Sequence, residues 1–107
     1  MNMAAYCFLD MYEIIDPDKL EKYRSGVLAT VKQFGGRYLL IGGMCDTIEG
    51  QWRPTFPVLI EFPSLDYANK WYNSQEYSEL KALRLAATKC NTVFTEGDPN
   101  KFLTSYK

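Results

Sequence analysis

Hydrophobic positions in the first third of the chain follow the period of a strand and then that of a helix. Residues 5–13 (AYCFLDMYE) are rich in aromatic and long apolar side chains and predict a first strand. Asp16 and Pro17 then supply an N-cap and a proline at the first helical position. Apolar residues recur every three or four positions from 20 to 34 and stop at two glycines, 35 and 36, which predicts an amphipathic helix with a glycine C-cap.

The rest of the chain predicts three more strands and two more helices. Residues 37–43 (RYLLIGG) and 56–62 (FPVLIEF) predict two strands, joined by a long connection of turn residues. The glycines at 42 and 43 either end the first of these strands or form a bulge in it. Ser64 can cap a short helix, Ser74 can cap a second one over residues 75–87, and residues 90–96 (CNTVFTE) predict the last strand.

This order of elements predicts an α+β fold of the ferredoxin-like βαββαβ type, a plait with an antiparallel four-stranded sheet and its helices on one face. The length of 107 residues suits one domain, which we place at residues 1–97, followed by a C-terminal tail at 98–107. The strands carry apolar residues on both faces, although the helices can cover only one. The second face therefore predicts a homodimer.

Composition narrows the function classes. Twelve basic and thirteen acidic residues, without a basic block, argue against nucleic acid as a partner. No apolar run approaches the roughly 20 residues that cross a membrane, so a cytoplasmic protein is expected. Three widely spaced cysteines predict reduced thiols, and the absence of histidine removes Ser–His and Cys–His pairs, HExxH zinc sites and a histidine ligand for haem. We expect neither a metal nor a cofactor.

Two acidic residues lie within predicted neighbouring strands. If Asp10 and Glu61 share a face, the pair could hold one raised pKa and act as acid or base in catalysis. The alternative is that each forms an ion pair or lies at a hydrated end of the sheet. Both interpretations stay open at this point.

Arg84 is the best single candidate for a functional side chain. It follows Tyr77 by seven residues on the predicted last helix, which places it on the inward-facing side. It could bind a substrate carboxylate, or it could neutralise Glu61 or Asp10.

Aromatic residues supply the remaining candidates for ligand contacts. Trp52, in the long connection, could anchor a partner subunit or close a pocket as a lid. Tyr72 and Tyr77 flank a helix break beside Trp71; such a cluster is typical of a core, although either hydroxyl could line a cavity.

Three segments, FGGRYLLIGG, EGQWRPTFPVLIEFPS and WYNSQEYSELKALR, together resemble the family known as domain of unknown function 1330 over about residues 5–96. The resemblance implies a dimeric α/β barrel and no established reaction. Related barrels include cofactor-independent monooxygenases, haem-degrading enzymes, isomerases and dehydratases, which by analogy suggests a pocket between sheet and helices. Ile41 and Phe56 stand where arginines are common in the family, which implies a more apolar pocket or interface.

Three hypotheses of function follow. The first is a homodimer that binds a small, partly apolar molecule between sheet and helices, with Arg84, Glu61 and Asp10 as polar contacts. The second is a cofactor-independent enzyme of the monooxygenase or isomerase type that uses the carboxylates as acid and base. The third is a structural dimer whose barrel is filled by its own side chains.

Overall fold

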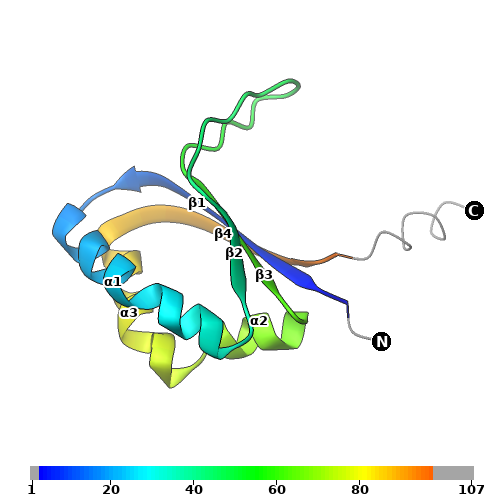
Figure 1. The fold of residues 1–107 in the computed structure, drawn as a ribbon. Helices are drawn as coiled ribbons and strands as arrows, with labels where there is room; N and C mark the ends of the chain where they lie inside the picture. Colours follow the sequence, from blue (N-terminus) through cyan, green and yellow to red (C-terminus); the bar gives the residue numbers. More distant parts are fainter. Residues whose placement is uncertain (1–2, 98–107) are drawn as a thin grey trace, which may run out of the picture.

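The computed structural model describes residues 3–97 as an α+β sandwich with the predicted order of elements. The strands are β1 (Ala5–Ile14), β2 (Arg37–Ile41), β3 (Pro57–Phe62) and β4 (Thr88–Glu96), and the helices are α1 (Pro17–Gln33), α2 (Leu65–Tyr72) and α3 (Gln75–Ala87). The antiparallel sheet has the order β2-β3-β1-β4. Figure 1 shows all three helices on one face of the sheet. The ferredoxin-like fold is thus confirmed, while the tail predicted at 98–107 lies outside the described residues.

Local chemistry sets the helix ends as predicted. The Asp16 carboxylate accepts a hydrogen bond from the Lys19 N–H at 3.2 Å at the start of α1. The Ser64 and Ser74 hydroxyls cap α2 and α3 in the same way. Gly35 has a φ of 77°, a conformation that a residue with a Cβ adopts only at a cost, and it ends α1. None of the described helices is long and apolar enough to span a membrane.

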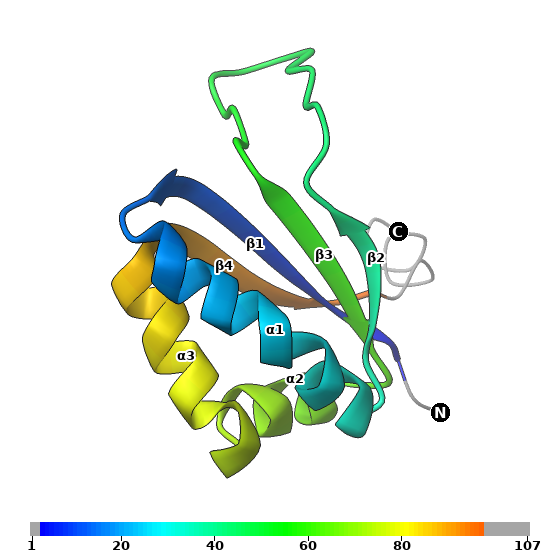
Figure 2. The same ribbon diagram turned by 60° about the vertical axis from the view of Figure 1, so that its left-hand side comes forward.

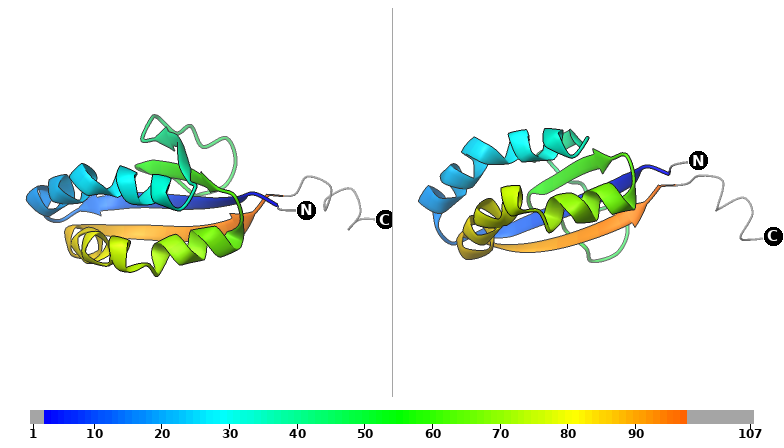
Figure 3. Two further views of the ribbon diagram at one scale, coloured as in Figure 1. Left: turned by 60° about the horizontal axis from the view of Figure 1, so that its bottom comes forward. Right: turned by 90° about the horizontal axis from the view of Figure 1, so that it is seen from below.

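The core lies between the sheet and the helices. Helices α1 and α3 lie side by side over the sheet, as Figures 2 and 3 show, and α2 packs against the strands at one end. The largest fully buried side chains in the described region are those of Trp71, Arg84, Tyr77, Phe62, Ile60, Val31 and Cys7. Arg84 is the only charged side chain in this group.

Strand β2 contains a bulge, but not at its glycines. The register against β3 shifts between Tyr38 and Leu40, and the strand ends at Ile41. Gly42, with a φ of 72°, follows the end of the strand and donates its N–H to the Pro57 carbonyl at 2.7 Å. The glycines therefore end the strand, and the upstream bulge turns the side chains of both Tyr38 and Ile41 toward the helices.

The other face of the sheet, here called the open face, is covered by none of the helices of residues 3–97. Phe8 pairs with Leu59 of β3 on one side and with Val93 of β4 on the other. The side chain of Val93 is 58% exposed. The connection between β2 and β3 projects beyond the sheet (Figures 1 and 2). Trp52 of this connection packs edge-on against Phe8, with 5.5 Å between ring centroids. The open face thus presents a band of apolar side chains.

Candidate functional site

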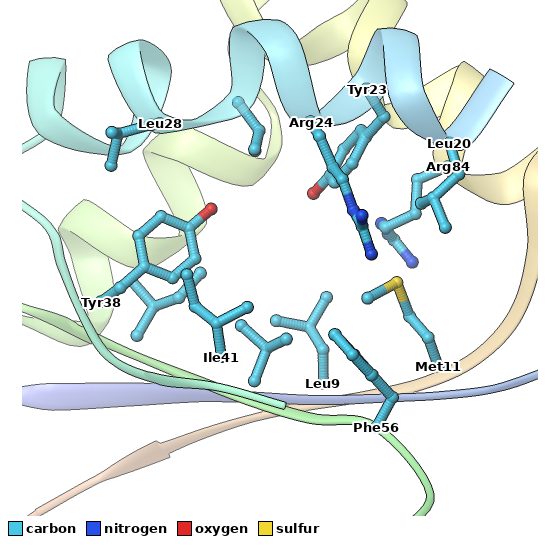
Figure 4. A pocket seen from close by; sticks show the side chains of 13 residues that line it. Leu9, Met11, Leu20, Tyr23, Arg24, Leu28, Tyr38, Ile41, Phe56 and Arg84 are labelled. Atoms are coloured by element: carbon cyan, nitrogen blue, oxygen red, sulfur yellow. The ribbon is translucent and has the colours of Figure 1, made fainter. Parts of the chain in front are cut away.

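A cavity of about 480 Å³ lies between α1 and the sheet (Figure 4). Its volume falls within the roughly 300–1,000 Å³ typical of small-molecule sites. The lining is aliphatic and aromatic except for two arginines and two tyrosine hydroxyls, and it consists of Leu9, Met11, Leu20, Tyr23, Arg24, Val27, Leu28, Tyr38, Ile41, Phe56, Val58, Ile60 and Arg84. No carboxylate is among these residues.

Arg84 supplies a buried positive charge to the cavity. Only 1% of its surface is exposed, and Figure 4 shows its guanidinium directed into the cavity near Met11. Its Nε donates to the Tyr77 hydroxyl at 3.3 Å and its Nη2 to the Tyr72 hydroxyl at 3.5 Å. Burial opposes the charge, but the Tyr77 hydroxyl keeps the pKa of Arg84 above its ordinary value, so the side chain is charged at neutral pH.

Arg84 forms no ion pair within residues 3–97. Both of its hydrogen-bond partners are phenols, which are neutral at pH 7. The guanidinium is therefore held by polar groups without a neutralising charge, an arrangement that is costly in a protein interior.

Arg84 is positioned by the spacing of α3 and by an aromatic cluster behind it. Tyr77 lies two helical turns earlier on the same face, and its ring packs on Trp71 with 4.1 Å between centroids. The Tyr77 and Tyr23 hydroxyls share a hydrogen bond of 2.9 Å, which links α3 to α1. The indole N–H of Trp71 donates to the Thr30 hydroxyl at 3.0 Å. These contacts fix the groups that hold the guanidinium.

The phenols near the cavity are hydrogen-bonding groups rather than bases. Burial raises the pKa of Tyr23, Tyr38 and Tyr77 above the ordinary 10.0. They therefore stay protonated near neutral pH. Figure 4 shows the Tyr23 and Tyr38 hydroxyls on the cavity side.

Arg24, Tyr23 and Tyr38 are site residues that the sequence did not predict as such. The amphipathic pattern of residues 20–34 places Tyr23 among the core positions and leaves Arg24 outside them. The available signal was its spacing, because Arg24 lies one turn from both Leu20 and Leu28, which line the same cavity. Its guanidinium lies 6.0 Å from the centre of the Phe56 ring.

Asp10 and Glu61 lie on the open face, away from the cavity. The strand register places Asp10 opposite Pro57 and Glu61 opposite Tyr6, so four positions, roughly 13 Å along the strands, separate the two acids. The predicted acid–base pair is therefore wrong. The sheet also separates both acids from Arg84, so their predicted contacts with this arginine and with a ligand beside it are wrong as well.

Each acid has a structural partner instead. The Asp10 carboxylate accepts from the N–H groups of Thr55 and Phe56, at 2.9 and 2.8 Å, and holds the end of the connection against the sheet. The Glu61 carboxylate accepts from Arg37 at 2.7 Å and from the Tyr6 hydroxyl at 2.9 Å. For Glu61 this agrees with the alternative interpretation, an ion pair.

The four predicted ligand contacts divide into two groups. Arg84 lines the cavity, and Tyr77 supports it from behind. Tyr72 packs between Phe94 and the ammonium group of Lys81, and its hydroxyl reaches Arg84 without joining the lining. Trp52 lies against Phe8 on the opposite face of the sheet and does not face the cavity.

We expect the stability of Glu61→Gln to fall less between neutral and acidic pH than that of wild type. Hydrogen bonds from Arg37 and Tyr6 lower the pKa of Glu61 below the ordinary 4.5. A lowered pKa in the folded state contributes stability that is fully present above about pH 4.5 and is lost as pH falls through the lower value. Thermal melts of wild type and Glu61→Gln from pH 3 to 7 should therefore differ most at neutral pH and converge in acid. A difference that stays constant with pH would contradict the prediction.

One protein family and several solved structures are similar to this chain. The sequence model for the family described as domain of unknown function 1330 matches residues 4–98. No curated protein matches the chain. Among solved structures, the RPA0582 protein of unknown function from Rhodopseudomonas palustris is 14% identical, with a TM-score of 0.71 over 92% of this chain and 85% of that chain.

Two further solved structures have a similar fold. A dimeric ferredoxin-like protein of unknown function from Jannaschia sp. CCS1 is 10% identical, with a TM-score of 0.65 over 88% of this chain and 99% of that chain. SnoaB, a cofactor-independent oxygenase from Streptomyces nogalater, is 8% identical, with a TM-score of 0.56 over 92% of this chain and 95% of that chain. At these identities the likeness concerns the fold alone.

Proposed function

The chain belongs to the family of domain of unknown function 1330, and from this premise we propose that it binds one small, mainly apolar molecule between α1 and the sheet. The cavity of about 480 Å³ is the observation that carries this proposal. Its apolar lining with a few polar groups is the usual composition of a ligand site. The cavity favours binding over the hypothesis of a purely structural protein.

The enzyme hypothesis has less support in the geometry. The described lining of the cavity contains no acid, and its tyrosines are protonated at neutral pH. Burial raises the pKa of the Cys7 thiol to about 12, so this cysteine is a poor nucleophile. The oxygenase activity of SnoaB is a property of that protein, and fold likeness alone does not transfer it.

We also propose that two copies of the chain pair through the open face. Large apolar side chains remain exposed there, among them Leu40 at 41% and Val93 at 58%. The similar protein from Jannaschia is dimeric, which supports this arrangement by analogy.

The neutral fluorescent probe N-phenyl-1-naphthylamine tests the binding proposal. We expect wild type to bind it at about one molecule per chain. Leu28→Trp should weaken binding about tenfold, which corresponds to about 1.4 kcal/mol, because Leu28 lies over the cavity and a larger side chain there obstructs it. Fluorescence titration measures both values.

Leu85→Trp is the matched control. Leu85 is an exposed leucine of α3, outside the cavity lining, and its replacement should leave the affinity unchanged. Absence of probe binding, or equal weakening by both substitutions, would refute the proposal.

A further inference from the structure

We infer that the ligand carries a carboxylate group and that Arg84 binds this group inside the cavity; this rests on the proposed function, since it specifies the ligand of the same cavity.

The charge of Arg84 is the first argument. The guanidinium is 1% exposed and has two phenols as hydrogen-bond partners. No carboxylate of the described residues forms an ion pair with it, so its positive charge is uncompensated. A carboxylate entering the cavity supplies the missing charge in surroundings of low polarity, where the attraction is strong. A neutral ligand leaves the charge as it is.

The free hydrogen-bond donors are the second argument. A guanidinium side chain has five N–H groups, and two of those of Arg84 point to Tyr77 and Tyr72. Three remain. No fully buried side-chain nitrogen or oxygen atom within the described residues lacks a partner, so Nη1, which carries two of these three N–H groups, is not sealed in the core. Figure 4 shows the guanidinium directed into the cavity. Two of them can hold the two oxygens of one carboxylate.

Tyr23 adds a further donor beside the guanidinium. The Tyr77 oxygen accepts from Arg84, so the Tyr77 hydroxyl can give its own proton to Tyr23 across their 2.9 Å contact. In that orientation the Tyr23 O–H is free to donate to the same carboxylate. Arg84 and Tyr23 can thus both donate to one group in the cavity, which suits an anion and not an ammonium group.

The remaining lining determines the body of the ligand. Leu9, Val27, Val58 and Ile60 offer no side-chain hydrogen bonds and line the same cavity as Arg84. At the positions of Ile41 and Phe56 the lining is apolar as well. The second charge, on Arg24, lies against Phe56. These residues suit an apolar body with one anionic head, such as an aliphatic or aromatic monocarboxylate.

Displacement of bound N-phenyl-1-naphthylamine by octanoate and by 1-octanol separates charge recognition from apolar binding, because the two competitors differ mainly in the head group. In wild type we expect octanoate to compete at a concentration at least tenfold lower than octanol. In Arg84→Met octanoate should lose at least tenfold in affinity while octanol changes less than threefold. Arg24→Gln, at the more exposed arginine, should cost octanoate less than Arg84→Met does.

The outcomes distinguish the carboxylate inference from the binding proposal on which it rests. Equal competition by octanoate and octanol in wild type, or displacement by neither, overturns the carboxylate inference while probe binding still supports the binding function. Failure of the probe itself to bind refutes both. Circular dichroism checks that Arg84→Met folds, and Arg84→Lys, which keeps a charge but loses the planar donors, provides a second variant that should retain part of the preference. A preference for octanoate that survives in Arg84→Met also overturns the role of Arg84.

Discussion

Replacement of Trp71 by alanine is expected to lower the free energy of unfolding by about 3–5 kcal/mol, the range for large aromatic residues in cores. Trp71 is fully buried, and its ring packs on Tyr77 and Phe62 with centroid distances of 4.1 and 5.4 Å. Its indole N–H is also the hydrogen-bond donor to Thr30. A domain of this size is stable by only about 5–15 kcal/mol in total, so the variant should be near its folding limit.

Urea denaturation followed by circular dichroism measures this effect. Tyr67→Ala is the control, because Tyr67 lies on the same helix but is 45% exposed, and it should cost less than about 1 kcal/mol. Similar values for the two variants would mean that the cluster around Trp71 is not the centre of the core.

A charge on the open face is expected to separate the proposed dimer. In Phe8→Glu the new carboxylate would lie between Leu59 and Val93, on a surface that the partner subunit is proposed to cover. Burying an unpaired charge costs several kcal/mol, so the dissociation constant should rise at least about 100-fold. Sedimentation velocity over a range of protein concentrations measures this shift.

The same charge placed elsewhere serves as the control. Leu85→Glu alters an exposed leucine of α3, at 59% exposure, on the helical side of the molecule and should leave the dimer intact. If wild type is a monomer at all concentrations, or if Phe8→Glu remains dimeric, pairing through the open face is wrong.

Most of the fold follows from local signals in the sequence. Asp16, Ser64 and Ser74 mark the helix starts because each side chain satisfies a free backbone N–H three residues later. The bulge in β2 has no comparable local signal in the sequence, because a register shift depends on the neighbouring strand. The alternation of apolar residues therefore did not predict that Tyr38 and Ile41 both face the helices.

The site was less predictable than the fold. Helical spacing from Tyr77 correctly placed Arg84 on the inner side of α3. The partners of that arginine depend on which face of the sheet each acid occupies, and this requires the strand register. Asp10 and Glu61 face away from it, so the expected charge pairing was absent and the isolated charge emerged only from the three-dimensional arrangement.

The position of Asp10 connects the two surfaces of the sheet. On the open face its carboxylate holds the backbone N–H of Phe56, while the side chain of Phe56 lines the cavity on the opposite face. If a ligand shifts Phe56, Asp10, on the face that the proposed partner subunit would cover, shifts with it. Thermodynamic reciprocity then requires that ligand binding change the strength of subunit association by the same factor by which association changes ligand affinity. One carboxylate would thus couple occupancy of the proposed ligand site to the proposed subunit association.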